Sequence, residues 1–259
     1  MVDFKAALRY PLEDDDWVPT VGIGGGLLFA NTTLTFIGLI AIAIFSVVLI
    51  GFLLFPPLIL VSLVFTLPLS GYSIAVLRST IRGEEEPPRF TDWKQLYKDG
   101  LVAVAIALAY LIPPVVGATI VLAVTGVPTL LLVLFEAGES LVGLGVLFVM
   151  LGIAVVVGAA FVYSFAMSYL VPVSLAIYAH ESDLRTALTL DRIKQVGLSS
   201  EFAVYWLSAI VINMIASQFI GFFMLIVVGF FMQFYLQIVI VRLYGLGYAS
   251  AMDLESAPA

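Results

Sequence analysis

The chain lacks cysteine and is poor in charge. Its 259 residues include no Cys and one His, and only 11% are Asp, Glu, Lys or Arg. Without cysteine the chain forms no disulfides, no thiolate metal sites and no cysteine nucleophile. A soluble domain carries about 25% charged residues because its surface must be hydrated. This composition therefore excludes an ordinary soluble protein.

Long apolar runs take the place of charge. The chain is 62% hydrophobic, and runs such as LTFIGLIAIAIFSVVLIGFLLF (34–55) match the roughly 20 residues that cross a bilayer. The first seventeen residues carry several charges and no apolar core of a secretory signal. We therefore predict an all-α integral membrane protein with a single polytopic helical domain over residues 1–259.

The basic residues predict how the chain crosses the membrane. They form clusters at 5–9, 78–98 and 185–194, followed by Arg242 alone. Cytoplasmic loops attract Lys and Arg, so an even number of spans between clusters places all of them on one side. We expect about six transmembrane helices in three hairpins in a cell membrane, with both termini cytoplasmic. The expected spans are 32–55, 57–78, 101–124, about 141–165, 202–221 and 224–246.

Several connections remain open at this level. Residues 18–31 are either an entry segment or the start of one long tilted helix. The apolar piece 127–135 is too short to cross and is expected to lie flat in the outer loop. Gly221 is the best candidate for the turn of the last hairpin. Asn31-Thr32-Thr33 matches a glycosylation sequon, but facing it outward would require an extra span and would turn the 78–98 cluster outward.

One charged segment, RGEEEPPRFTDWKQLYKDG (82–100), interrupts the apolar sequence. Gly83 and the two following prolines break the chain, and Thr91 can cap a short helix. In that helix Trp93, Leu96 and Tyr97 fall near one face, and Trp and Tyr prefer the headgroup level. We predict an amphipathic helix on the inner membrane surface.

Similar segments precede the other two hairpins. Residues 1–17 and 180–200 each combine basic residues with an apolar stripe. Each hairpin is therefore predicted to follow a cytoplasmic amphipathic surface helix, and residues 249–259 form a tail. Chance similarity of short amphipathic pieces is the alternative.

The stretch SGYSIAVLRSTIRGEEEPPRFTDWKQLYKDGL (70–101) resembles the signature of the domain of unknown function 4013 family, archaeal multi-pass membrane proteins. The segments LRYPLEDDDW and FYLQIVIVRLYGLGYASA also resemble it, so the likeness extends over nearly the whole chain. A more distant similarity is to the membrane domain of some bacterial glycerophosphodiesterases. The resemblance implies the architecture and an archaeal origin, and no activity comes with it. The net charge of −7 further predicts a halophile, because an acidic surface stays hydrated; an ordinary acidic protein is the alternative.

Two polar or irregular features within the spans are candidates for function. Pro113-Pro114 fall inside a span, where proline bends a helix; broken helices build transporter sites, but plain kinks are also tolerated. Asn213 and Gln218, with Gln233 and Gln237, could line a path or join helices by hydrogen bonds. Arg242 is expected near the inner end of the last span, with its side chain reaching outward.

Other motifs have simple structural explanations. GIGGG (22–26) lacks the context of a nucleotide site, and Gly22 and Gly26 have a helix-packing spacing. His180, Glu181 and Asp183 could hold a metal, but an interfacial polar turn explains them better. Glu136 and Glu139 suit a hydrated loop, and Asp99 and Glu201 suit helix N-termini.

These features favour a non-enzymatic membrane protein, a scaffold or accessory subunit that organises lipid or partner proteins. The alternative is a transporter or channel for a small solute that uses the Pro-broken third span. A lipid enzyme is least favoured, because no catalytic set is visible. We expect no cofactor and no metal; the partners are membrane lipids, and a second copy or another membrane protein, with no nucleic acid. The candidate functional or interface residues are Trp93, Tyr97, Pro113, Pro114, Asn213, Gln218 and Arg242.

Overall fold

The computed structural model describes residues 4–14, 17–46 and 53–254, and its regular structure over these residues is entirely helical. Within this part of the chain six helices are long and apolar enough to cross a membrane. They are α2 (Trp17–Phe45), α3 (Phe55–Ile81), α4 (Trp93–Leu134), α5 (Glu139–Glu181), α8 (Ser200–Phe223) and α9 (Val228–Ala251). The shorter helices are α1 (Phe4–Arg9), η1 (Tyr10–Leu12), α6 (Leu184–Ala187), α7 (Leu190–Gly197) and η4 (Met224–Ile226). The prediction of an all-α membrane protein with six long apolar helices is confirmed.

The chain forms two compact units. The first unit contains residues 1–105 and 172–259, and the second contains residues 106–171. The first unit thus joins the two ends of the chain, and the second is the distal part of the α4–α5 hairpin.

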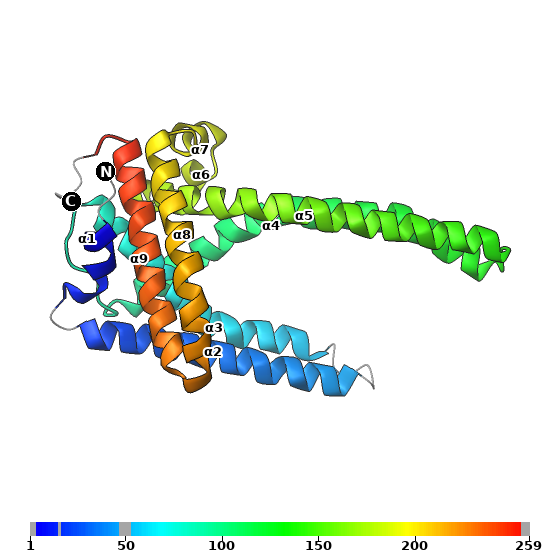
Figure 1. Cartoon of the computed structure of the whole chain (residues 1–259), viewed down its shortest axis with the longest axis horizontal. Coiled ribbons are helices and arrows are strands. Elements are labelled where there is room, and N and C mark those ends of the chain that lie inside the picture. The colour runs from blue at the N-terminus through cyan, green and yellow to red at the C-terminus, as the bar shows by residue number, and fades with distance from the viewer. Residues whose placement is uncertain (1–3, 15–16, 47–52, 255–259) are drawn as a thin grey trace. The chain divides into compact units, whose positions relative to one another are not determined.

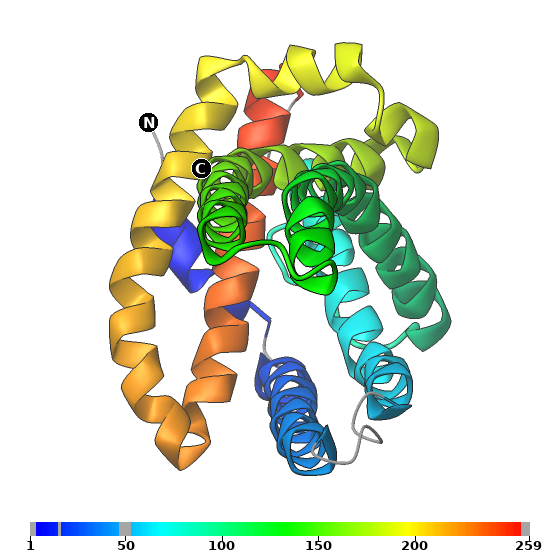
Figure 2. The same cartoon turned by 90° about the vertical axis from the view of Figure 1, so that its right-hand side faces the viewer.

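In the first unit, α8 and α9 form an antiparallel hairpin and α2 and α3 pack on α9. Both α8 and α9 lie lengthwise in the two views, whereas α2 lies lengthwise in Figure 1 and end-on in Figure 2. Helix α2 therefore runs across the direction of the α8–α9 hairpin. The core beside α9 holds large, fully buried side chains: Tyr10, Tyr72, Phe202, Phe234, Leu243 and Tyr248.

Glycines let the helices of the first unit approach closely. A Cβ at Gly71 of α3 would collide with the Leu96 carbonyl of α4, and a Cβ at Gly100 of α4 would collide with the Leu67 carbonyl. The two helices therefore meet backbone to backbone, a contact that a larger residue would prevent.

The glycine-rich start of α2 also serves packing, but through other residues than predicted. Gly24 faces the ring of Phe234 and Gly25 faces Phe231, both on α9. Around Gly22 and Gly26 there is open space where a Cβ would lie. The prediction that the latter pair makes the close contact is wrong, because α9 meets the face of α2 between them.

Helix α2 starts at Trp17 and is continuous, so residues 18–31 are the start of one long helix rather than a separate entry segment. Asn31 lies inside this helix, and its Oδ1 accepts a hydrogen bond of 2.8 Å from the Ser62 hydroxyl of α3. The amide thus joins two helices, a structural role that the sequon interpretation did not include.

The charged segment 82–100 contains no separate surface helix, so that prediction is wrong. Helix α4 starts at Trp93 and continues without a break to Leu134. Its N-terminus is capped by Asp92, whose carboxylate accepts the Gln95 N–H at 3.0 Å, rather than by Thr91. The first turns stay in line with the rest of α4 because Leu96 packs against the Gly71 backbone of α3. Short helices do precede the other two hairpins, at α1 and at α6–α7.

The turn of the last hairpin lies at residues 224–227, where Val227 has a positive φ of 66°. The prediction of Gly221 is wrong, since Gly221 lies inside α8. Gly229 permits the tight reversal, because a Cβ there would collide with the backbone of Met224.

In the second unit α4 and α5 pack through small residues. A Cβ on Gly145 would lie 2.9 Å from the Thr129 side chain, and a Cβ on Gly152 would lie 2.8 Å from the Thr125 side chain. Because Thr129 packs on α5 in this way, the apolar piece 127–135 continues α4 as far as Leu134. The prediction that this piece is a separate segment lying flat is therefore wrong.

Candidate functional site

Polar side chains from distant parts of the sequence meet in the first unit. We call this group the polar cluster: Tyr10, Asp14, Arg78, Ser79, Arg89, Asp99, Tyr178 and Arg242. They come from η1 and the residues after it, the end of α3, the 82–92 loop, the start of α4, the end of α5, and α9.

Asp99 is the centre of the first contact in the polar cluster. Its side chain is only 1% exposed. Arg78 binds both carboxylate oxygens, with Nη1–Oδ2 at 2.9 Å and Nη2–Oδ1 at 3.4 Å. The Tyr178 hydroxyl donates to Oδ1 at 3.2 Å, and Arg78 Nε donates to the Ala179 carbonyl at 3.4 Å. A buried, charge-assisted contact therefore joins α3, α4 and the last turns of α5.

The N-terminal segment is held by a second buried carboxylate. Asp14 is 2% exposed, and Arg89 donates to it from Nη2 at 2.6 Å and from Nε at 3.0 Å. Since Arg89 lies in the 82–92 loop, this two-point contact fixes that loop to the segment that precedes α2.

Tyr10 links the same segment to α3 and α9. Its hydroxyl lies 3.0 Å from the Ser79 hydroxyl, and its ring lies 3.7 Å below the guanidinium carbon of Arg242. Burial raises the pKa of Tyr10 above its ordinary value, so the phenol stays protonated. Arg242 also donates from Nη1 to the Glu84 carbonyl at 3.3 Å. The candidate Arg242 is thus held by a cation–π contact with Tyr10 of η1 and by a hydrogen bond to the 82–92 loop.

An aromatic layer adjoins the polar cluster. Phe90 stacks on Tyr72 with the ring centres 4.2 Å apart, and it also contacts Phe234 and Trp93. The candidate Trp93 remains 41% exposed. The candidate Tyr97 donates its hydroxyl to the Val64 carbonyl of α3 at 2.9 Å. Both residues therefore join the start of α4 to neighbouring parts of the first unit, Trp93 to the 82–92 loop and Tyr97 to α3.

His180, Glu181 and Asp183 have separate partners and do not converge. His180 Nδ1 lies 3.0 Å from the Tyr248 hydroxyl, and Glu181 forms a 2.7 Å ion pair with Arg192 of α7. Asp183 caps α6 by accepting two backbone N–H groups and the Thr186 hydroxyl. These hydrogen bonds lower the pKa of Asp183. The interfacial polar turn is the interpretation that fits these contacts.

The prolines of α4 lie beside grooves of the second unit. Pro113 and Pro114 line a groove of about 340 Å³, and Pro114 also lines a groove of about 470 Å³. The linings are mostly apolar, and the Tyr163 hydroxyl is already used in a 2.6 Å bond to the Tyr110 carbonyl. Such grooves suit hydrocarbon better than a polar solute.

The candidate amides lie elsewhere, on α8. Asn213 and Gln218 are exposed on that helix, and Asn213 Oδ1 accepts a weak contact of 3.4 Å from Ser217 on the same helix. Gln237 instead joins two helices, since its Nε2 donates to Ser73 Oγ at 3.0 Å. The hydrogen-bonding interpretation therefore describes Gln237, whereas Asn213 and Gln218 point away from the core.

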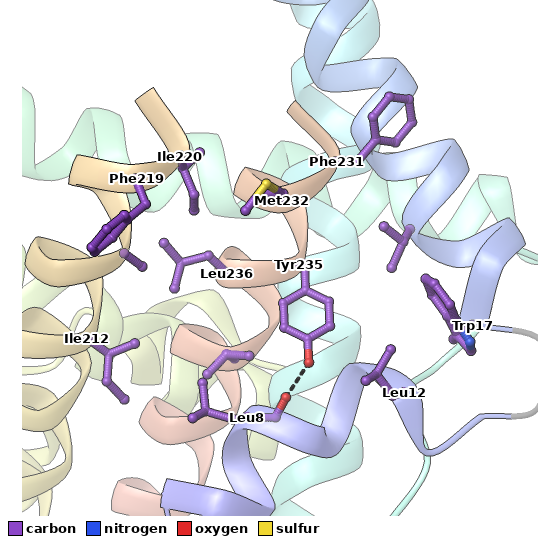
Figure 3. Close-up of a pocket in the computed structure, with 13 residues that line it drawn as sticks. Leu8, Leu12, Trp17, Ile212, Phe219, Ile220, Phe231, Met232, Tyr235 and Leu236 are labelled. Atoms are coloured by element: carbon purple, nitrogen blue, oxygen red, sulfur yellow. Dashed lines mark hydrogen bonds between the residues drawn. The ribbon is translucent and has the colours of Figure 1, made fainter. Parts of the chain in front are cut away.

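Figure 3 shows a further groove in the first unit, between α1 and η1 on one side and α8 and α9 on the other. Its volume is about 530 Å³. The Tyr235 hydroxyl is directed at the Leu8 carbonyl and ties α1 to α9. The other lining side chains are apolar: Leu8, Leu12, Trp17, Val21, Ile212, Ala216, Phe219, Ile220, Phe231, Met232, Leu236 and Val239.

Sequence reasoning missed Asp99 and Asp14 as the buried centres of this site. The sequence predicts Asp99 as a carboxylate at a helix start, and it shows Asp14 as one of several acids in the charged N-terminal segment. A weak signal for Asp99 existed, since it precedes Gly100 within the stretch that resembles a known family. No local pattern reveals that Asp14 pairs with Arg89, 75 residues away.

Comparison with known proteins identifies a family but no activity. A family model described as "Protein of unknown function (DUF4013)" matches residues 54–226, well over half the chain. No curated protein and no solved structure matches the chain. The matched region contains Arg78, Arg89 and Asp99, whereas Tyr10, Asp14 and Arg242 lie outside it.

Proposed function

This chain belongs to the DUF4013 family, and we propose that it is a non-enzymatic membrane scaffold or accessory subunit that organises lipid or partner proteins. As a multi-pass membrane protein it offers large apolar surfaces to lipid. We place it in the cell membrane with both termini cytoplasmic, because its basic residues then share the side that attracts them.

The observation that carries the proposal is the apolar lining of the grooves. The grooves beside Pro113–Pro114 and the groove under α1 are lined mostly by aliphatic and aromatic side chains. A path for a polar solute needs convergent polar groups to replace the hydration of the solute. Grooves with this lining suit lipid chains or apolar helices.

The arrangement of the polar side chains supports the same proposal. Asp99 and Asp14 are buried against arginines that bind them at two points. Groups used in this way hold helices and loops in one arrangement. Asn213 and Gln218 are both exposed on α8, where they can meet headgroups or a partner rather than a solute.

The transporter remains the second candidate, because the two grooves of the second unit lie beside the prolines of α4. Filling a groove separates the two functions. Gly117 lines the groove beside Pro113, and nothing lies within 4 Å of the position of a Cβ there. Gly117→Leu therefore fills the groove without a clash at the new Cβ. Gly126→Leu is the matched control, since Gly126 lies on the same helix, also has open space, and is not part of that lining.

The assay compares growth and solute uptake of cells that carry each variant with a strain that lacks the gene, alongside membrane abundance. We expect both variants to behave as the unmodified protein does, because a scaffold does not need an open groove at Gly117. If an abundant Gly117→Leu protein behaved as the deletion does while Gly126→Leu did not, the scaffold would be rejected in favour of transport.

A further inference from the structure

Helices α2 and α9 point in different directions, although both are long enough to cross a membrane. Helix α2 has 29 residues and α9 has 24, which correspond to about 43 and 36 Å. Since α2 runs across the α8–α9 hairpin in both views (Figures 1 and 2), the two cannot both stand steeply in one bilayer. One of them lies closer to the membrane plane.

The distribution of charged residues indicates which of the two helices lies closer to the membrane plane. The sequence carries no charged residue from Val18 to Leu77, a region that contains α2 and nearly all of α3. Helix α9, in contrast, carries Arg242 and packs beside α1 and η1, which belong to the charged N-terminal segment. The Tyr235 hydroxyl bonds the Leu8 carbonyl of α1, next to the exposed side chain of Arg9.

The position of the Tyr235–Leu8 contact along α9 determines how deep Arg9 would lie if α9 crossed the membrane. Tyr235 lies sixteen residues before Ala251, the end of α9, or about 24 Å along the helix. If α9 crossed a hydrocarbon core of about 30 Å, Arg9 would lie deep within hydrocarbon on the surface of the protein. Charged side chains at that depth are costly and face the bundle interior or water. With α9 in the membrane plane, Arg9 can reach water.

The turns of the α4–α5 and α8–α9 hairpins also differ in polarity. The α4–α5 tip contains Glu136 and Glu139, as expected of a turn that reaches water. The α8–α9 tip has no polar side chain from Phe219 to Met232, and Leu225 is 83% exposed. Irregular backbone exposed to lipid is not tolerated in the hydrocarbon core. At the membrane interface, water reaches this backbone while the apolar side chains insert into lipid.

The connection between α2 and α3 is also apolar in sequence. The composition of the tip therefore does not distinguish the two hairpins by itself. The direction of α2 and the charges beside α9 make that distinction. The exposed amide of Asn213, on the side of α8 opposite Ile215 and Phe222, agrees with it, because an interfacial helix can present that side to water.

From these observations we propose that the α8–α9 hairpin lies along the membrane face as an in-plane anchor, with its exposed apolar side chains in lipid, while α2 crosses. The occupant of this surface is the lipid bilayer itself. Both ends of the hairpin stay on one side, so the expected side of the termini does not change. The inference concerns how the protein sits in the membrane and goes beyond the scaffold proposal.

Spin labels measure the depth of each helix directly. Because the chain contains no cysteine, single cysteines can be labelled at exposed positions and reconstituted in phosphatidylcholine–phosphatidylglycerol vesicles. In the α8 series the first and last labelled residues are eighteen positions apart, and in the α4 control series they are twenty-one positions apart. All labelled residues are exposed. The sites are Val204, Val211, Ile215 and Phe222 on α8, and Leu101, Leu108, Val115 and Leu122 on α4.

Oxygen and nickel accessibility then give the depth of each label. We expect the α8 depths to fall within about 10 Å of one another, as for an interfacial helix, and the α4 depths to cover most of the roughly 30 Å core. The proposal is overturned if the α8 labels cover the same range of depths as the α4 labels. This includes the case in which the depth varies little along both helices.

Thiol labelling provides a second measurement in intact cells. With the termini inside, an in-plane hairpin keeps Leu225→Cys shielded from an impermeant thiol reagent, whereas Gly138→Cys at the α4–α5 tip is labelled. Labelling of Leu225→Cys to the same extent as Gly138→Cys would contradict the in-plane anchor. Both positions are exposed in sequence regions that form turns, so the substitutions leave the packed core unchanged.

Discussion

Asp99 in the first unit and Gly152 in the second hold helices together by opposite means. Asp99 is buried and accepts hydrogen bonds from Arg78 and Tyr178. Gly152 contributes no side chain and lets Thr125 of the facing helix approach. The first contact depends on charge and direction, and the second depends on the absence of bulk.

The difference shows which contacts fix the arrangement of the helices most strictly. A buried carboxylate bound at two points accepts one partner in one geometry, so the polar cluster fixes which elements meet. Helices that pack through small residues in lipid gain close van der Waals contact, and their interhelical hydrogen bonds are weak on average. We therefore expect substitutions in the polar cluster to cost far more stability than substitutions between α4 and α5.

The largest effect is expected for Asp99→Asn. This change removes the charge that compensates Arg78 inside the first unit. Breaking a buried ion pair by removing one partner costs 3–5 kcal/mol, and we expect about 3 kcal/mol because Arg78 is 19% exposed. The measurement is the midpoint of thermal unfolding in detergent, followed by circular dichroism.

Glu84→Gln is the matched control for this prediction. Glu84 forms an ion pair with Arg82 at 3.7 Å, and both side chains are well exposed, so the loss should be below about 1 kcal/mol. Replacing both members of the buried pair, Arg78→Met with Asp99→Leu, should recover much of the loss. Equal midpoints for Asp99→Asn and Glu84→Gln would mean that the polar cluster does not specify the first unit.

A smaller effect is expected where α3 and α4 meet backbone to backbone. Gly71→Ala would bring a Cβ into the Leu96 carbonyl, and carbonyl backbone cannot move aside as a flexible side chain does. Inserting a methyl group into a packed contact typically costs 1–3 kcal/mol, so we expect about 2 kcal/mol by the same thermal measurement. In the second unit, Gly117→Ala meets open space and should leave the midpoint unchanged or raise it, since alanine favours helix over glycine. A similar loss in both variants would remove the distinction between the two positions.

Composition and periodicity predicted the membrane class and the long helices well. Apolar length decides whether a segment crosses, and that quantity is read directly from sequence. The boundaries were less accurate where tertiary contacts extend a helix. Helix α4 begins at Trp93 after the Asp92 cap, and its first turns pack on Gly71 through Leu96. It continues to Leu134, and Thr129 near this end packs on Gly145. Neither contact leaves a trace in the local sequence.

The candidate site was predicted only in part. Arg242 and Tyr97 were selected from sequence, and they contact the 82–92 loop and α3 respectively. The partners of Asp14 and Asp99 were not found, because a carboxylate near a helix start has the same local pattern whether it is hydrated or buried. Pairing over 75 or 21 residues is decided by how the helices pack. The predictions of a halophilic and archaeal origin stay predictions.

The smallest effect is expected in the second unit, for Thr129→Val. The Thr129 hydroxyl lies 2.8 Å from the Thr125 carbonyl on its own helix and 3.0 Å from the Gly145 carbonyl of α5. Valine keeps the shape and the methyl contact with Gly145 but cannot donate a hydrogen bond. Hydrogen bonds between membrane helices average about 0.6 kcal/mol, which corresponds to about a threefold change in the unfolding equilibrium.

Thr119→Val tests whether the interhelical bond causes that change. Among the described residues the Thr119 hydroxyl hydrogen-bonds to the Val115 carbonyl of its own helix, so valine removes a bond within α4 rather than one to α5. Equilibrium unfolding of the whole chain in mixed detergent micelles compares the two variants. We expect Thr129→Val to lose about 0.6 kcal/mol more than Thr119→Val. A loss for Thr129→Val as large as that for Asp99→Asn would show that hydroxyl direction specifies the α4–α5 packing as strictly as charge specifies the first unit.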